Sequence, residues 1–272
     1  GIRSVDRDGE ITVVSEEKHP VYCRPLISYY LEGKTKIENI GYRPADFYEK
    51  NNCRVLYGRR AQRLEPDEKK VYLDDGTALS WDSICVAAGS SPFVPPMAGL
   101  DSVENKFGFM TLDDALAVEK AVDGEKRVLI IGAGLIGLKC AEGILGRAKS
   151  VTVCDLADRV LSSILDAESA AIMQSHLEKC GVRFMLGDTA ASFDKNTAHM
   201  KSGRDVEFDV LILAVGVRAN SALVKDAGGD AGRGIVIDGR CAASLPDVYA
   251  AGDCTESRDA SDGRIKVMAL MP

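Results

Sequence analysis

The stretch Val128–Asp155, "VLIIGAGLIGLKCAEGILGRAKSVTVCD", decides the fold of this 272-residue chain. It begins with an apolar run, passes through three closely spaced glycines into a helical pattern, and ends in a second apolar run closed by an acid. This order predicts a strand over Arg127–Ile131, a helix over Leu135–Arg147 and a strand over Ser150–Cys154. Because a helix joins the two strands, we expect them to lie parallel in one sheet.

The glycines at the turn follow a spacing with a chemical purpose. Gly132, Gly134 and Gly137 form GxGxxG directly between strand and helix. The first permits a tight turn, the second lets a pyrophosphate approach the backbone, and the third lets the helix pack close to the strand. The first helical residues, Leu135 and Ile136, offer unpaired N–H groups to phosphate oxygens. The motif predicts a dinucleotide site, and the alternative is a glycine turn without a ligand.

An acid completes this unit. Asp155 follows Gly137 by 18 residues and stands at the end of the next predicted strand. A carboxylate there accepts hydrogen bonds from a ribose 2′-hydroxyl and repels a 2′-phosphate. The sequence therefore favours NADH over NADPH.

Composition narrows the class of protein. Apolar residues make up 46% of the chain, which is enough for a packed core. The net charge is −7 and the basic residues form no long run, so neither a nucleic-acid partner nor an anionic membrane surface is expected. No apolar stretch reaches the roughly 18 residues of a membrane span, and no signal peptide is visible at Gly1. We expect a cytoplasmic protein.

The eight cysteines form no CxxC or CxxxxC pair. Several lie in apolar runs, where a free cysteine behaves as a small hydrophobe. We interpret them as reduced, buried thiols. The three histidines are not spaced with cysteines as ligands usually are, so no metal site is predicted.

Further patterns surround the central unit and alternate between strands and helices. They predict strands over Ile11–Ser15, Arg54–Leu56, Arg63–Glu65, Lys70–Leu73 and Ser83–Ala87, helices from Pro25, over Thr111–Val122 and over Ala167–Lys179, and later strands in "VEFDVLILAVG", "GIVIDG" and "DVYAAGDC". The fold class is α/β, with one domain inserted in another. We place the outer domain at 1–110 and 234–272 and the inserted domain at 111–233.

Motifs outside the centre carry a resemblance. "DVYAAGDC" has a strand ending in Gly252 and Asp253, and "VAAGSSP" has Ala88 and Gly89 after another strand. "LAVGVRAN" repeats that pattern at Gly216, and "VVSEEKHPVYCRPLIS" follows a strand with an acid and an arginine. In this order the motifs resemble the pyridine nucleotide-disulfide oxidoreductases. Taken alone, "AGD" is equally a loop carboxylate that caps a helix.

The resemblance implies a doubly wound FAD-binding domain, incomplete here, with an inserted Rossmann-like NAD-binding domain. It assigns Glu16 to the adenosine ribose of FAD, Arg24 to the side of FAD, and Asp253 to its ribityl–phosphate part. The final "VMALMP" resembles the segment beneath the flavin ring. The glycine motif of the FAD domain would precede Gly1 and an interface domain would follow Pro272, so we read the chain as a fragment.

The resemblance also bears on the acceptor. Members that reduce disulfides or oxidise NADH through a thiol carry CxxxxC or a single cysteine, and here Cys23 is merely the nearest thiol. We therefore expect hydride transfer from NADH to flavin and electron transfer to a small redox protein or a fused iron–sulfur or sirohaem module, as in rubredoxin and ferredoxin reductases and the flavin module of nitrite reductase. The alternatives are a thiol-using NADH oxidase or disulfide reductase acting through Cys23, and a non-catalytic nucleotide-binding subunit. A homodimer stays open.

Two positions depart from the pattern together. Many relatives carry Glu two residues after the third glycine, where this chain has Lys139. In some, that Glu pairs with a Lys at the place of Tyr29. We interpret Lys139 as a catalytic candidate that faces the nicotinamide or flavin N5 and stabilises negative charge. The alternative is an exposed helix lysine.

Overall fold

The predicted strand–turn–helix–strand is present in the computed structural model of the protein, which describes residues 1–267. It forms β9 (Arg127–Ile131), α5 (Leu135–Ile144) and β10 (Ser150–Asp155). The helix ends three residues earlier than expected, in a stretch where Gly143 and Gly146 lower the helix propensity. The residues 268–272, which hold most of the sequence expected beneath the flavin, lie outside the described part.

The chain divides into two units by its internal contacts. The first unit comprises Gly1–Tyr22, Gly41–Ser91 and the described residues from Arg218 onward; the second comprises Cys23–Ile40 and Pro92–Val217. These bounds differ from the expected 1–110, 111–233 and 234–272, because 23–40 and 92–110 pack with the second unit and 218–233 packs with the first.

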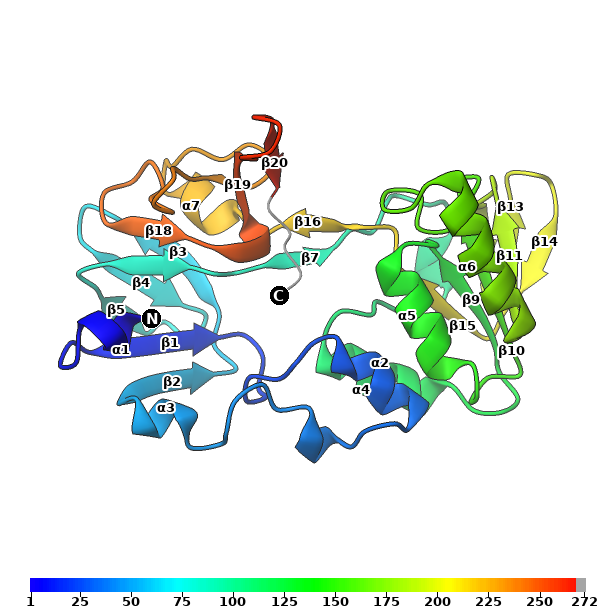
Figure 1. Ribbon diagram of the computed structural model, residues 1–272, viewed down its shortest axis with the longest axis horizontal. Coiled ribbons are helices and arrows are strands. Elements are labelled where there is room, and N and C mark those ends of the chain that lie inside the picture. Colours follow the sequence, from blue (N-terminus) through cyan, green and yellow to red (C-terminus); the bar gives the residue numbers. More distant parts are fainter. Residues whose placement is uncertain (268–272) are drawn as a thin grey trace. The chain divides into compact units, whose positions relative to one another are not determined.

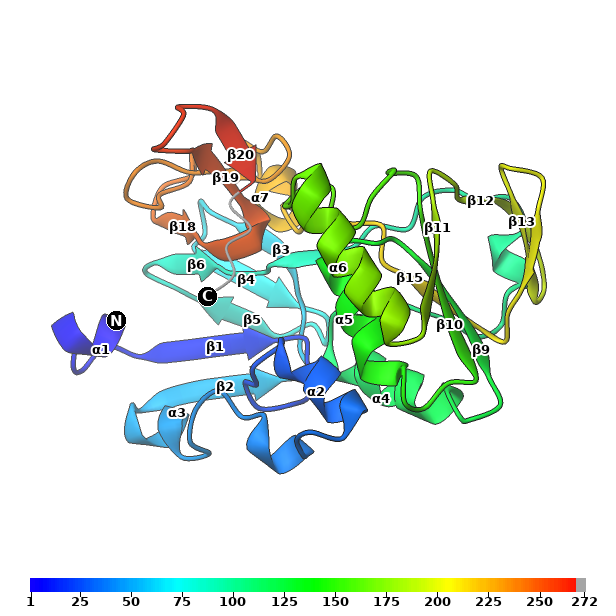
Figure 2. The same cartoon turned by 45° about the vertical axis from the view of Figure 1, so that its right-hand side comes forward.

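A parallel sheet forms the centre of the second unit. Helices α5 and α6 (Ala167–Lys179) lie on one face, and a three-stranded antiparallel sheet lies on the other (Figures 1 and 2). Burial on both faces explains the continuous apolar runs of its middle strands. The five parallel strands lie in the order β11 (Val182–Leu186), β10, β9, β15 (Val210–Leu213) and β8 (Lys106–Phe107), and the antiparallel sheet in the order β12 (Ala190–Asp194), β13 (Thr197–Met200) and β14 (Asp205–Glu207).

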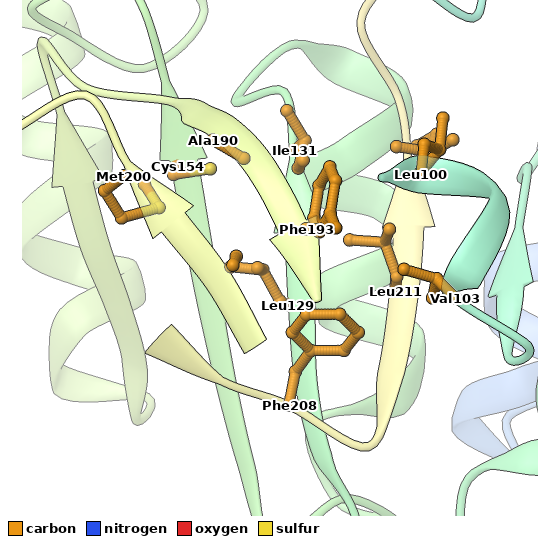
Figure 3. Close-up of a cluster of buried hydrophobic side chains, with 12 residues drawn as sticks. Leu100, Val103, Leu129, Ile131, Cys154, Ala190, Phe193, Met200, Phe208 and Leu211 are labelled. Carbon is orange, nitrogen blue, oxygen red and sulfur yellow. The ribbon is translucent and has the colours of Figure 1, made fainter. Parts of the chain in front are cut away.

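One cluster of buried side chains in the second unit lies between these two sheets (Figure 3). The rings of Phe193 and Phe208 meet edge to face with centroids 6.1 Å apart, over Leu129 of β9. Leu100 and Val103, in and beside the 3₁₀ helix η2 (Leu100–Ser102), are buried in the same cluster. This contact places the segment 92–110 in the second unit.

Two further helices pack beside α5: α2 (Leu26–Glu32) contacts both α5 and α4 (Leu112–Ala121) (Figures 1 and 2). Helix α4 begins with a reciprocal capping box formed by Thr111 and Asp114. A Cβ added to Gly143 would lie 2.9 Å from the carbonyl oxygen of Ser28, so α2 and α5 approach closely. The segment 23–40, which also holds the 3₁₀ helix η1 (Ile37–Asn39), therefore belongs to the second unit.

The first unit is built from short strands around its own apolar cluster, which includes Leu64, Val86 and Val248. Its sheets are the parallel pair β1 (Ile11–Ser15) and β2 (Cys53–Tyr57); the parallel pair β6 (Ile84–Val86) and β18 (Val248–Ala250); the antiparallel β3 (Ala61–Glu65), β4 (Lys70–Leu73) and β5 (Ala78–Ser80); and the mixed β17 (Ile235–Val236), β19 (Thr255–Arg258) and β20 (Ile265–Val267). Its helices are α1 (Ile2–Val5), α3 (Phe47–Lys50), α7 (Ala222–Asp226) and the 3₁₀ helix η3 (Gly252–Cys254).

The chain passes between the units four times, at 22/23, 40/41, 91/92 and 217/218. The last two passages are strands, β7 (Ser90–Pro92) and β16 (Val217–Ala219), and they pair with each other. The two crossover motifs expected from "VAAGSSP" and "LAVGVRAN" fall at these points.

Candidate active site

The glycines of the central motif divide into two kinds. Gly132 has φ +114°, and a Cβ there would lie 2.2 Å from the carbonyl oxygen of Ala214. A Cβ on Gly137 would lie 2.0 Å from the carbonyl oxygen of Gly132. Gly134 differs, because no atom lies within 4 Å of the position of its Cβ. Gly132 and Gly137 are thus required by packing, whereas Gly134 leaves open space at the surface.

The open space lies at the start of α5. Gly134 is the N-cap residue, and no side chain caps the helix there. The first backbone N–H groups of a helix have no partner within it, so those of Leu135 and Ile136 are available to a ligand. The N-terminal end of the helix dipole favours an anion at the same place. The geometry suits a pyrophosphate group.

Asp155 ends β10 beside this turn. Its Oδ2 accepts a hydrogen bond of 2.6 Å from the Ala133 N–H, and its Oδ1 accepts one of 2.8 Å from the Ala157 N–H. An ionised carboxylate offers about four acceptor positions, so both oxygens can still accept from a ribose hydroxyl. The Asp155 carboxylate therefore also holds the glycine turn in place through Ala133, a role that its spacing from Gly137 did not indicate.

Lys139 lies on α5, two residues beyond Gly137, and its side chain is 31% exposed. Its Nζ forms an ion pair with Glu142 and lies 4.6 Å from the centroid of the Tyr29 ring on α2. The resemblance already pairs these two positions, since some relatives carry a Glu and a Lys there, and in this chain a lysine and an aromatic ring are in contact instead. The two positions that depart together from the family pattern are therefore neighbours.

The first unit gathers four of the predicted residues at one edge. Strands β6 and β18 run parallel and pair in register, so their carboxyl ends coincide. The residues after these ends are Ala88 and Gly89 on one side and Gly252 and Asp253 on the other. Gly89 and Gly252 have positive φ, and a Cβ on either would meet nothing within 4 Å. In open α/β sheets, ligands bind outside the carboxyl ends of the strands.

Ser90 and Asn220 form hydrogen bonds with residues at this edge, and neither was predicted as a site residue. Asp253 Oδ2 accepts a hydrogen bond of 3.3 Å from the Ser90 hydroxyl. The side-chain amide of Asn220 donates to the carbonyl oxygen of Ala88 at 2.8 Å. Each pair is separated by well over a hundred positions along the chain, so no local signal could have found it.

The remaining predicted residues are distributed between the units. Glu16 follows β1 in the first unit and its carboxylate lies 3.8 Å from the Arg60 guanidinium. Arg24 belongs to the second unit, where its Nη1 donates to the carbonyl oxygen of Met110 at 2.9 Å. Gly216 has φ +112° and accepts a hydrogen bond from the Phe93 N–H at 2.9 Å.

The cysteines are all free, but the expectation that they are buried holds for only three: Cys140, Cys154 and Cys254. Burial raises the pKa of the Cys140 thiol well above its ordinary range and that of Cys154 to about 12, so neither is a ready nucleophile. Cys85, Cys180 and Cys241 are exposed, because they fall at strand faces and turns that the sequence does not separate from the core. Cys23 is half-buried.

Comparison with known proteins shows which proteins this chain is similar to. A nitrite reductase [NAD(P)H] of Bacillus subtilis is 31% identical over 97% of this chain, and an NADH oxidase of Methanocaldococcus jannaschii is 33% identical over 95%. The chain spans about a third (33%) of the nitrite reductase and 60% of the NADH oxidase. The solved putidaredoxin reductase in covalent complex with putidaredoxin superimposes with a TM-score of 0.91 at 27% identity, over 98% of this chain and 67% of that one.

The predicted α/β fold class is confirmed by this likeness. No helix within residues 1–267 combines the length and apolar character needed to cross a membrane. The sequence model of the pyridine nucleotide-disulphide oxidoreductases, which are FAD-dependent NAD(P)H oxidoreductases, matches residues 2–269. The predicted resemblance and the predicted class of cofactors are thereby confirmed, and this chain belongs to the pyridine nucleotide-disulphide oxidoreductase family.

Proposed function

We propose that the protein is an FAD-dependent NADH oxidoreductase that passes electrons to a protein redox partner. The observation that carries the proposal is the open space over Gly134 at the uncapped start of α5, beside the Asp155 carboxylate. The family match extends over both units, and FAD is the second nucleotide that proteins of this family use.

In this proposal the second unit binds NADH. The turn at Gly132, Gly134 and Gly137 and the N–H groups of Leu135 and Ile136 hold its pyrophosphate. Asp155 accepts from the ribose hydroxyls and disfavours a 2′-phosphate, which sets the preference for NADH over NADPH.

The first unit supplies most of the FAD site. Asp253 and Gly252, with Ala88 and Gly89, form the edge at β6 and β18, where both glycines leave room for a ligand. Glu16 is assigned to the adenosine ribose of FAD. Arg24, which the resemblance places along FAD, and Gly216, which it gives as a cofactor-binding residue, belong to the second unit.

FAD, when bound, supplies the chemistry, since it accepts a hydride from NADH and passes electrons on singly. The chain itself orients the two nucleotides and supplies fixed charge. Lys139 is the candidate for the latter, because it is a half-buried cation two residues beyond the glycine turn. In the complete protein, Lys139→Ala should slow flavin reduction by NADH in stopped flow, and an unchanged rate removes Lys139 from the site.

The competing function is electron transfer through the thiol of Cys23. The similarity to an NADH oxidase favours testing it. The discriminating experiment titrates Cys23→Ser and the unmodified complete protein with NADH, each with bound FAD and without oxygen. We expect each to consume one NADH per flavin, because direct electron transfer uses no oxidised thiol. Uptake of a second equivalent of NADH by the unmodified protein alone would replace the proposal with the thiol mechanism.

The partner, the assembly and the location extend the proposal. The resemblance implies a small redox protein or a fused iron–sulfur or sirohaem module as acceptor. The similarity to a nitrite reductase and to a complex of putidaredoxin reductase with putidaredoxin supports a protein acceptor. A cytoplasmic location fits the eight free thiols. Light scattering on the complete protein tests whether it forms a homodimer.

A further inference from the structure

We infer that Tyr29 is a positioning residue that holds the amino group of Lys139 through the face of its ring. The catalytic meaning of this contact rests on the proposed function, whereas the contact itself rests on the geometry of α2 and α5. Nothing in the sequence motif requires an aromatic side chain at this position.

The amino group of Lys139 has two neighbours of different kinds. Glu142, one turn further along α5, forms an ion pair with it, and the Tyr29 ring on α2 lies 4.6 Å from it. A cation within about 6 Å of an aromatic centroid is attracted by the ring quadrupole. The ring attracts the ammonium without carrying a charge of its own, whereas the Glu142 carboxylate offsets the charge. Tyr29 therefore fixes the lysine while leaving its positive charge in place.

The ring can do this because its helix is firmly seated. Ile27, Ser28 and Leu31 are buried on α2, and Gly143 on α5 allows the two backbones to approach closely. Tyr29 itself is 40% exposed, so it contributes little to the core. A change of this side chain is expected to alter the contact with Lys139 without unfolding the unit.

A second lysine, Lys34, also lies near the Tyr29 ring and allows a comparison with Lys139. The amino group of Lys34 lies 5.5 Å from the centroid and forms a 2.6 Å ion pair with Glu32, and its side chain is 56% exposed. Lys139 is both nearer to the ring and less exposed, at 31%. Removal of the ring should therefore affect Lys139 more than Lys34.

The first arm of the test measures the reactivity of individual lysines toward limiting acetic anhydride, by mass spectrometry of the complete protein. The reactivity of Lys139 is taken relative to Lys149, an exposed lysine with a distant carboxylate partner at 3.9 Å. Tyr29→Leu should raise this ratio about two- to fivefold, the range expected for loss of a partly exposed cation–π contact. Tyr29→Phe, which keeps the ring, should restore the original ratio.

Tyr42 provides a matched control, since it is 51% exposed and contacts the Arg43 guanidinium at 4.8 Å. Tyr42→Leu should leave the Lys139 ratio unchanged. The inference is overturned if Tyr29→Leu leaves the ratio unchanged, or if Tyr29→Phe raises it as much as Tyr29→Leu does.

The second arm measures flavin reduction by NADH in the complete protein. Tyr29→Leu should lose rate in the same direction as Lys139→Ala, and the double variant should be no slower than Lys139→Ala alone, because the two residues act through one amino group. Fully additive losses would overturn the positioning role. If the labelling ratio rises but Lys139→Ala is as fast as the unmodified protein, the positioning stands and the catalytic role proposed for Lys139 fails.

Discussion

Substitution of single glycines in the central turn separates packing from ligand binding. Gly137→Ala would place a Cβ 2.0 Å from the carbonyl oxygen of Gly132, which is 1.4 Å closer than the 3.4 Å where ordinary contact begins. Gly134→Ala meets no atom within 4 Å, and its φ of −79° suits alanine. The two positions lie three residues apart, yet Gly137→Ala should lower the stability of the protein whereas Gly134→Ala should leave it nearly unchanged. Both variants should weaken NADH binding.

The magnitudes follow from these contacts. Gly137→Ala forces α5 away from β9 and should cost about 1–3 kcal/mol of unfolding free energy, as overpacking usually does. For Gly134→Ala, loss of the glycine N-cap costs roughly 0.5–1 kcal/mol, and reduced freedom of the unfolded chain returns about 0.4–1 kcal/mol. The unfolding free energy of Gly134→Ala should therefore stay close to its original value. Its methyl group fills the space where the pyrophosphate would lie, so NADH affinity should fall at least about tenfold.

The assays are thermal unfolding followed by circular dichroism, and titration of NADH followed by its fluorescence. Gly137→Ala should lower both Tm and affinity, whereas Gly134→Ala should lower affinity alone. The interpretation of Gly134 is refuted if Gly134→Ala binds NADH as well as the unmodified protein. The interpretation of Gly137 is refuted if Gly137→Ala unfolds at the original temperature.

Three further predictions test other parts of the structure. Asp155→Ala removes the acceptor of the Ala133 and Ala157 N–H groups and should narrow the ratio of NADH to NADPH affinity about tenfold or more, as measured by parallel titrations. The Glu119 carboxylate raises the pKa of Tyr30 from 10.0 to about 12, so folding favours the protonated phenol. The contribution of this hydrogen bond to the unfolding free energy should be complete below pH 10.0 and lost toward pH 12. Tyr30→Phe should remove this pH dependence, as measured by denaturant unfolding. The Ser202 hydroxyl lowers the pKa of the buried Asp188 carboxyl below 3.8. The contribution of this hydrogen bond to the unfolding free energy should be present above pH 3.8 and lost as the pH falls further. Ser202→Ala should lower the unfolding free energy by about 1–2 kcal/mol near neutral pH, as measured by chemical unfolding.

Local signals predicted the central elements well. β9 and α6 have the predicted bounds, and Thr111 caps α4, because strand runs, glycine turns and capping residues act over a few positions. The strands β12, β13 and β14 were not predicted, since they are short and mix polar with apolar residues. Their stability comes from Phe193 and Phe208 packing on the parallel sheet, which no window of sequence reveals.

The site shows the same division. Gly132, Gly134, Gly137 and Asp155 could be placed because they follow one strand–helix–strand unit. The edge of the first unit could be placed through resemblance, but its partners Ser90 and Asn220 could not. Membership of the segment 23–40 in the second unit depends on the close approach at Gly143, a contact between helices more than a hundred positions apart.

In the proposed function, this protein binds both FAD and NADH, and NADH reduces the flavin. Its most direct test is to load the complete protein with FAD, remove oxygen, add one equivalent of NADH and record the visible flavin absorbance. The proposed function predicts that the flavin absorbance is bleached as NADH is consumed. A complete protein that binds no FAD, or whose bound FAD keeps its absorbance in the presence of NADH, would contradict it.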